Sequence, residues 1–295
     1  MRKRHKNRTG YFFSMPAFLF MIALIGFPII YNWVISFQNM TIRTFNAGTV
    51  KFNGFENYIE VLGDSNFWTA FGNTFLYTIV CIVFQFVIGF LLALLFHQKF
   101  KAAKPMRGLL VISYILPMTV VALMFKYMFS DSGIVNYILT SLHLIDEPIQ
   151  WLTSTGMALP TVIITNIWVG IPFDMLLLST GLSNIPADVY ESATIDGAGR
   201  LQKFFYVTLP MMRESILAVL VLGFVGTFKV FDLVYVMTGG GPVNATEVLS
   251  TYSYRESFQA FNFGTGAASA NILFLCLFAV GLIYIKLIGK EEQVQ

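Results

Sequence analysis

Polar side chains are scarce in this 295-residue chain, and several of them fall inside long apolar runs. A polar group in such a run is energetically expensive, so it marks a candidate position along a path for a polar solute. Aromatic rings there could stack on an apolar face of a solute, while amides could bind its hydroxyl groups. The candidates for such a path are Gln85, Asn166, Trp168, Asp174, Phe231, Asp232, Tyr235 and Asn271.

Two alternatives stay open for these residues. Aromatic side chains also pack between helices or lie at the lipid interface. Lys229 and Asp232 are three residues apart, a spacing that puts them on one helix face where they could pair with each other. The sequence therefore indicates a polar path without defining the solute.

The residue types needed for catalysis or metal binding are not clustered. His5, His97 and His143 are far apart, and Cys81 and Cys276 lie in apolar runs, which argues against a metal site and a disulfide framework. No nucleotide-binding Gly-x-x-x-x-Gly-Lys-Ser/Thr segment occurs. We therefore expect a chain that is not an enzyme and binds no cofactor or metal itself.

The composition indicates where the chain folds. Hydrophobic residues make up 56% of it and charged residues 12%, with a mean hydropathy of +0.68, whereas soluble domains carry about a quarter charged residues. Apolar runs recur that are long enough, at about 20 residues, to cross a bilayer as helices. We predict an all-α integral membrane protein with a single domain over residues 1–295. Its six expected spans are residues 11–37, 67–96, 106–129, 156–182, 214–237 and 264–287.

The orientation follows from the lysines and arginines of the short connections, which favour the cytoplasmic side. Most of them lie at the amino terminus, in the second and fourth connections and in the carboxyl-terminal tail. The chain is therefore predicted to be a multi-pass protein of a bacterial inner or plasma membrane with both termini in the cytoplasm. The residues that carry this prediction are Arg2, Lys3, Arg4, Lys6, Arg8, Lys99, Lys101, Lys104, Arg107, Arg200, Lys203, Arg213, Lys286 and Lys290.

The connection between the fourth and fifth spans, residues 183–212, is longer than a simple link requires and has a helical pattern of its own. Pro186 suits a first helical turn, and residues 187–195 are predicted to form a helix. Asp196 and Gly197 then predict a turn, in which Gly197 can adopt a left-handed backbone. Residues 198–207 are predicted to form a second short helix, which Leu209-Pro210 ends. We expect a folded cytoplasmic element that docks another protein.

The residues of this element resemble the cytoplasmic Glu-Ala-Ala motif of ATP-binding cassette (ABC) importer permeases, followed by Gly and then Leu-Pro. Glu191, Ser192 and Ala193, then Asp196, Gly197 and Ala198, match its spacing, with serine in place of the usual alanine. Residues within this connection and others later in the chain resemble the carbohydrate-uptake branch, typified by maltose, oligosaccharide and glycerol-3-phosphate permeases. These residues are Ile185-Pro186, Tyr190, Gln202-Lys203-Phe204, Phe231-Asp232 and Thr238-Gly239-Gly240-Gly241-Pro242.

The resemblance implies a permease subunit that forms half of a translocation pore and takes up an oligosaccharide or another sugar. Glu191, Ser192, Ala193, Asp196, Gly197 and Ala198 would form the coupling helix that docks on a separate ATPase. The implied partners are a second homologous permease, two cytoplasmic ATPase subunits that bind ATP and Mg²⁺, an extracytoplasmic solute-binding protein and membrane lipid, with no nucleic acid. The glycine run 239–241 would form an external turn or a contact with that binding protein.

Three other functions are alternatives for the same residues. An ABC permease for glycerol-3-phosphate stays possible because Lys126 and Lys229 lie within apolar runs. A proton-coupled secondary transporter would need a relay of buried carboxylates, and Asp174 and Asp232 are the acids found inside the expected spans. A membrane-embedded enzyme would need clustered histidines or acids, which the sequence lacks.

Overall fold

The structure is a computed structural model that describes residues 3–98 and 100–289. Arg2, Lys99 and Lys290, which contribute to the predicted orientation, lie outside the described residues. The described part is helical, and strand-like pairing within it is limited to isolated β-bridges. Two compact units can be distinguished, one made of residues 1–65 and 252–273 and the other of residues 66–251 and 274–295.

Four helices of the described chain are long and apolar enough to cross a membrane, and up to six spans result if two bent helix pairs are each one span. The four spans are Tyr11–Ser36, Ser65–His97, Ala158–Ser183 and Phe263–Lys286. They agree within a few residues with the first, second, fourth and sixth spans expected from the sequence. The predicted all-helical membrane fold is thus confirmed.

The first unit contains the first span, which combines α1 (Lys3–Met21), a π-helical turn η1 (Ile22–Gly26) and α2 (Phe27–Ser36). The short helices α3 (Ile42–Asn46) and α4 (Glu56–Gly63) follow it. The unit also includes the π-helical turn η3 (Arg255–Gln259) and the first part of α16 (Phe263–Gly289). A polar network joins α2, α4 and α16, because Asn32 donates to Asn271 (2.7 Å) and Asn271 donates to Tyr58 (3.1 Å).

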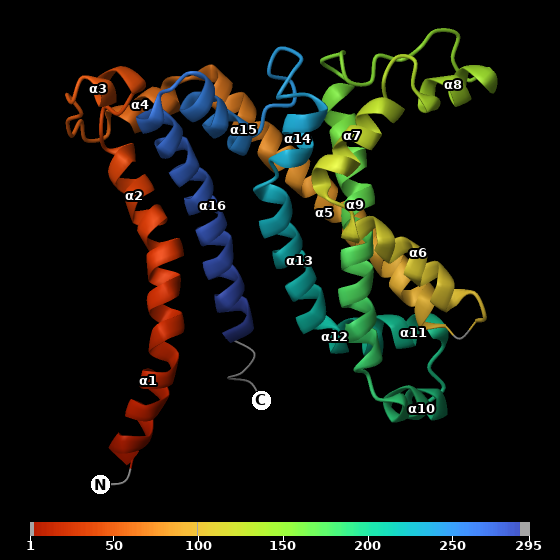
Figure 1. Ribbon diagram of the computed structural model, residues 1–295. Coiled ribbons are helices and arrows are strands. Elements are labelled where there is room, and N and C mark those ends of the chain that lie inside the picture. Colours follow the sequence, from red (N-terminus) through yellow and green to blue (C-terminus); the bar gives the residue numbers. More distant parts are fainter. Residues whose placement is uncertain (1–2, 99, 290–295) are drawn as a thin grey trace. The chain divides into compact units, whose positions relative to one another are not determined.

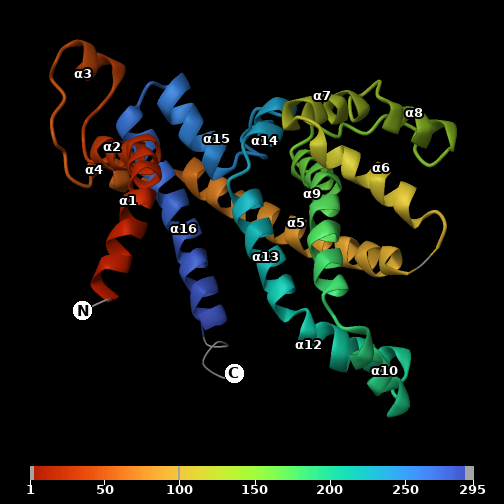
Figure 2. The ribbon, with the colours of Figure 1, turned by 60° about the horizontal axis from the view of Figure 1, so that its bottom comes forward.

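The second unit is built on α5 (Ser65–His97) and α9 (Ala158–Ser183). Helix α6 (Ala103–Ile115) and helix α13 (Arg213–Phe228) both pack on α9, and α7 (Met118–Met128) packs on α14 (Asp232–Met237). Helix α8 (Ile134–Ser141) follows α7, and α15 (Leu249–Tyr254) follows α14. Figures 1 and 2 show α10 (Ala187–Ile195) and α14 near opposite ends of α13.

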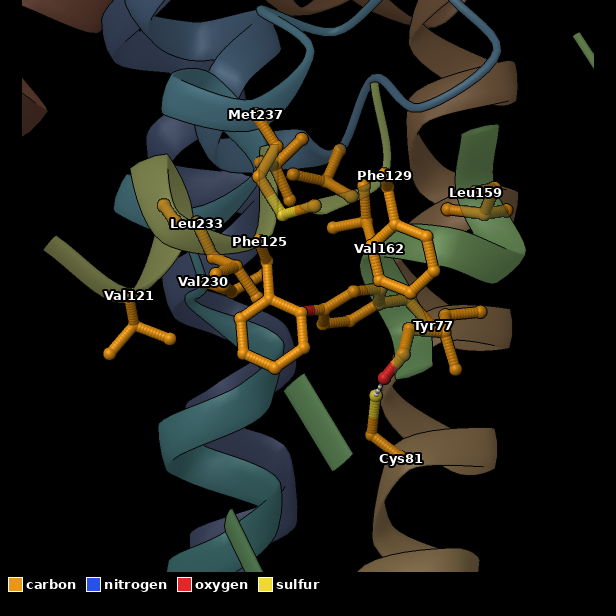
Figure 3. Close-up of a cluster of buried hydrophobic side chains, with 14 residues drawn as sticks. Tyr77, Cys81, Val121, Phe125, Phe129, Leu159, Val162, Val230, Leu233 and Met237 are labelled. Atoms are coloured by element: carbon orange, nitrogen blue, oxygen red, sulfur yellow. Dashed lines mark hydrogen bonds between the residues drawn. The ribbon is translucent and has the colours of Figure 1, made fainter. Parts of the chain in front are cut away.

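Buried apolar side chains form two clusters in this unit. The first cluster surrounds α14 and includes Tyr77 from α5, Phe125 from α7, Val162 from α9 and Leu233 from α14 (Figure 3). The second cluster joins α5 and α9 to the first half of α13 and the residue before it, through Phe90, Leu182, Met212 and Val219. The two clusters therefore hold the two ends of α13 within the unit.

Three boundaries differ from those expected. The third span is broken between α6 and α7 by a 99° bend, since Pro117 cannot continue the hydrogen bonding of α6. The fifth span is not continuous over residues 214–237, because α13 ends at Phe228 and α14 begins at Asp232. Leu209-Pro210 does not end the second short helix, because the π-helical turn η2 (Phe204–Thr208) runs into α12 (Leu209–Met211) and Pro210 lies in its first turn.

Candidate functional site

A cavity of about 380 Å³ lies within the second unit, a size in the range of small-molecule sites. Its walls come from α5, α6, α7, α9, α13 and the break between α13 and α14. Both apolar and polar groups line it, as is usual for small-molecule sites. The lining residues are Gln85, Tyr114, Met118, Asn166, Val169, Gly170, Phe173, Asp174, Leu222, Gly223, Gly226, Thr227, Lys229, Val230, Phe231 and Asp232.

Helix α9 supplies a polar face to this cavity. Asn166, Gly170 and Asp174 are four residues apart in turn, a spacing that places them on one side of a helix. Asp174 is 3% exposed, and its side chain has no hydrogen bond or ion pair with the described residues. Asn166 is 6% exposed, and its side-chain nitrogen has no partner within the described ranges. The cavity thus has an acceptor and a donor beside it that the described protein leaves unpaired.

Gln85 is fixed in place between α5 and α9. Its side-chain Nε2 donates to the backbone carbonyl of Asn166 at 2.8 Å. A Cβ atom on Gly170 would lie 2.3 Å from that same nitrogen, so only glycine leaves room for the amide. Gln85 therefore presents a side chain of defined position at the cavity wall.

The break after α13 places Lys229, Phe231 and Asp232 at the cavity. The backbone leaves the helical conformation at Phe231, with φ −130° and ψ −60°. Ser250 donates a hydrogen bond to the carbonyl of Val230, and Lys126 Nζ donates to the carbonyl of Val236 at 3.0 Å. Irregular backbone at membrane depth is tolerated where it lines a cavity, which is its location here.

Five of the eight residues predicted for a solute path meet at this cavity, namely Gln85, Asn166, Asp174, Phe231 and Asp232. Lys229 also lines the cavity. The side chains of Lys229 and Asp232 form no ion pair with each other in the described structure. The predicted pairing between them is therefore absent from this structure.

The other three predicted path residues do not line the cavity. Trp168 packs against Phe125, with ring centroids 5.2 Å apart, and Tyr235 stacks on Phe231 at 5.1 Å. Asn271 belongs to the first unit, where it takes part in the network with Asn32 and Tyr58.

Some lining residues were missed by the sequence analysis. Tyr114 on α6 lines the cavity and stacks on Phe173, with ring centroids 5.6 Å apart. Gly223 and Gly226 on α13 line it as well, with open space beside them. The spacing of Gly170 between Asn166 and Asp174 was a usable signal, because all three share one helix face. Tyr114 carried no such signal, since tyrosine is common at the ends of membrane helices.

The predicted docking residues form an exposed element between α9 and α13. Helix α10 ends at Ile195 and Gly197 follows with φ +81°, the left-handed turn predicted for it. The amides of Gly197 and Ala198 donate to the carbonyls of Thr194 and Ala193 at 3.1 Å and 2.9 Å, a pattern that caps the helix end. Glu191, Ser192, Asp196 and Gly197 are exposed, and Ala193 and Ala198 are half-buried.

The short helix α11 (Arg200–Lys203) and η2 connect this element to α13. Ile195 and Leu201 on either side of the Gly197 turn are exposed apolar residues that the sequence analysis did not select. Phe204 contacts Phe90 of α5, with ring centroids 5.8 Å apart. The element is thus open on one side and attached to the spans on the other.

The glycine run after α14 forms a compact turn at the other end of α13. Gly239 and Gly240 have φ of +64° and +91°, which glycine adopts without strain. Asn73 of α5 donates to the carbonyls of Ala245 and Glu247 at 3.1 Å and 3.0 Å and so fixes the loop that follows. The glycine run therefore forms a tight turn, which is one of the two alternatives predicted for it.

An all-helical chain with apolar spans, a polar-lined cavity among them and an exposed helical element between two spans defines a membrane permease. The chain belongs to the family described as binding-protein-dependent transport system inner membrane component, which matches residues 85–291. The resemblance inferred from the coupling element is thereby confirmed.

Several curated relatives share most of their length with this chain. The sulfoquinovosyl glycerol transport system permease protein SmoG of Agrobacterium fabrum is 32% identical, with 94% of this chain and 89% of the relative covered. The diacetylchitobiose uptake system permease protein DasB of Streptomyces coelicolor is 31% identical, with 99% and 91% covered. The trehalose/maltose transport system permease protein MalF of Thermococcus litoralis is 28% identical, with 96% and 95% covered.

Among solved structures, a chain of a bacterial ABC transporter involved in the import of the acidic polysaccharide alginate has the same fold. The TM-score is 0.81 at 22% identity, and the match covers 96% of each chain. A second structure, of bacterial alginate ABC transporter in complex with alginate pentasaccharide-bound periplasmic protein, matches with a TM-score of 0.81 and 22% identity over 95% of this chain and 93% of that one.

Proposed function

We propose that this chain is a permease subunit of an ATP-driven sugar importer. It passes a sugar along the cavity between α5, α9 and α13, and its exposed element docks on a separate ATPase. The observation that carries the proposal is the position of α13, which lines the cavity with Gly223 and Thr227 and is continuous in sequence with the coupling element. One helix is therefore in contact with both the solute path and the docking element.

The cavity supports a polyhydroxyl solute. Gln85, Asn166 and Asp174 offer amide and carboxylate groups that can bind hydroxyls, while Phe173 and Phe231 offer ring faces on which an apolar sugar face can stack. The names of the relatives SmoG, DasB and MalF refer to sulfoquinovosyl glycerol, diacetylchitobiose and trehalose or maltose. An oligosaccharide or another sugar is therefore the substrate class that we assign to this chain.

The proposed assembly contains a second homologous permease, two cytoplasmic ATPase subunits and an extracytoplasmic solute-binding protein. The chain itself is non-catalytic and binds no cofactor, and ATP with Mg²⁺ is bound by the ATPase subunits. It resides in a bacterial cell membrane with both termini in the cytoplasm, so that α10 faces the ATPase and the loop after α14 faces the binding protein. Glu191, Ser192, Ala193, Asp196, Gly197 and Ala198 form the docking surface.

The test is reconstitution of the full importer, with its second permease, ATPase and binding protein, into vesicles. Uptake of labelled maltotriose, N,N′-diacetylchitobiose and glycerol-3-phosphate is measured with and without ATP. We expect sugar uptake that requires ATP and the binding protein and that survives a protonophore. Uptake that needs a proton gradient instead of ATP would show a secondary transporter, and uptake of glycerol-3-phosphate alone would contradict the sugar assignment.

A substitution in the coupling element tests the docking role. Gly197→Leu should abolish uptake and weaken copurification of the ATPase, because a branched side chain is strained at φ +81° and blocks close approach. Gly48→Leu is the matched control, because Gly48 has φ +63° and open surroundings but lies far along the chain from the element. Equal effects of both substitutions would contradict a specific role for Gly197.

A further inference from the structure

We propose that the Tyr190 hydroxyl is a positioning group that transmits movement of the coupling helix α10 to α13 through Thr208. The conformational change of the ATPase then moves α13, which forms one wall of the cavity. This inference rests on the proposed function, and it assigns a task to two residues outside the exposed docking surface.

The contact between the two residues is short and partly buried. The Tyr190 hydroxyl and the Thr208 hydroxyl are 2.9 Å apart, and Thr208 is 5% exposed. Tyr190 lies in α10, one residue before Glu191, while Thr208 is the last residue of η2. The bond thus joins the docking helix to the segment that leads into α13.

A second bond acts between the same two segments. Lys203 Nζ donates to the Thr194 hydroxyl at 2.7 Å, and that hydroxyl donates to the carbonyl of Tyr190 at 2.6 Å. In contrast, no side-chain hydrogen bond in the described part of the chain joins α10 to α9, which precedes it. Residues 184–186 between α9 and α10 end in the extended backbone of Pro186. Helix α10 is therefore tied by its side chains toward α13.

The path from Thr208 to the cavity contains one bend, of 66°, between residues 200–211 and α13. Helix α12 follows Thr208 directly, and Met212 between α12 and α13 is fully buried in the second apolar cluster. Helix α13 then reaches the cavity at Leu222 and Gly223. At the rise of an α-helix, the stretch of α13 from Arg213 to Gly223 is about 15 Å long. Because the residue at the bend, Met212, is buried among apolar side chains, a displacement of Thr208 is passed on to α13 and so to the cavity wall.

The hydroxyl can be removed without disturbing its surroundings. The Tyr190 ring packs on the second apolar cluster, and Tyr190→Phe retains that ring. Thr208 would keep a partner, because its hydroxyl also donates to the carbonyl of Lys203 at 3.3 Å. No buried group loses all its hydrogen bonds in this variant, so we expect the fold and the ATPase docking surface to survive.

The experiment uses the complete importer in vesicles and measures sugar imported per ATP hydrolysed, with labelled maltotriose or N,N′-diacetylchitobiose as the solute. Tyr190→Phe and Thr208→Val should each lower that ratio about fivefold, the size of effect expected from one net hydrogen bond. The double variant should be no worse than either single one, because both remove the same bond. ATPase copurification and ATP turnover should stay near the wild-type values.

Thr180→Val is the control, because the Thr180 hydroxyl bonds within its own helix, to the carbonyl of Leu176 at 3.1 Å. Wild-type ratios in both Tyr190→Phe and Thr208→Val would overturn the inference. A lower ratio accompanied by loss of ATPase copurification would overturn it too, because docking would then be the affected step. A wild-type complex that imports no sugar with ATP would overturn the proposed function and this inference together.

Discussion

Asp174 is held at the cavity wall by the close approach of α5 to α9. A Cβ atom on Gly89 would lie 2.8 Å from the Cβ of Asp174, so the two helices are nearly in backbone contact there. The carboxyl group is buried and has no partner among the residues that the structure describes. Carboxylate oxygens accept hydrogen bonds, so the hydroxyl groups of a sugar are suitable donors. Asp174 is therefore the residue at which solute binding is most directly testable.

Asp174→Asn keeps the shape of the side chain but replaces one acceptor oxygen with a donor. We expect the KM for sugar uptake to rise about tenfold, because a hydrogen bond between the sugar and the replaced carboxyl oxygen is lost or reversed. Reconstituted importer and labelled maltotriose or N,N′-diacetylchitobiose give the measurement. Asp131→Asn, at an exposed position between α7 and α8, is the control and should leave KM unchanged. An unchanged KM in Asp174→Asn would remove Asp174 from the solute path.

The sequence could identify polar residues within spans but not what each of them contacts. Gln85, Asn166 and Asp174 meet at the cavity, whereas Asn271 bonds to Asn32 and holds the first span to the sixth. An asparagine in an apolar run has the same appearance in both situations. Whether such an asparagine lines a cavity or joins two spans depends on the helix that packs against it, and that helix is distant in the sequence.

At the scale of the helices, the contact between α5 and α9 depends on small residues. A Cβ atom on Gly89 would lie 2.8 Å from the Cβ of Asp174, 3.1 Å from the backbone nitrogen of Met175 and 3.3 Å from the carbonyl oxygen of Ile171. Backbone atoms cannot yield as a flexible side chain can. Close packing through glycine is a common way for membrane helices to associate.

Gly89→Ala should therefore destabilise the protein by about 1–3 kcal/mol, the usual range for overpacking. Thermal unfolding of the purified chain in detergent is the measurement. Gly72→Ala is the matched control, because Gly72 lies on the same helix with nothing within 4 Å of its Cβ position. It should leave stability unchanged or raise it, since alanine favours a helix. Equal midpoints for the two variants would contradict the packing argument.

Helix positions were predictable where they follow from the length of an apolar run, as in the spans Ser65–His97 and Ala158–Ser183. The bend at Pro117 also had a local cause. The break at residues 229–231 did not, because Lys-Val-Phe contains no helix breaker. Hydrogen bonds from Ser250 to the carbonyl of Val230 and from Lys126 to the carbonyl of Val236 stabilise it instead. Contacts between distant residues are needed to find such a break.

At the scale of the whole molecule, the proposed function requires a defined orientation in the membrane. The coupling element precedes α13 and the glycine turn follows α14, and the two lie near opposite ends of α13 (Figure 1). An ATPase in the cytoplasm and a binding protein outside can both be engaged only if these ends face opposite sides. The lysines and arginines at residues 200–213 favour the cytoplasm for the coupling element.

Single cysteines report this orientation. In a chain with Cys81→Ala and Cys276→Ala, Val243→Cys and Leu201→Cys are introduced separately, at side chains that are 90% and 74% exposed. In intact cells, a membrane-impermeant maleimide should label the cysteine at 243 at once. The cysteine at 201 should react only after the membrane is permeabilised, because it lies on the ATPase side. Labelling of 201 in intact cells would place the coupling element outside, where no ATPase could reach it, and the importer mechanism would then be wrong for this chain.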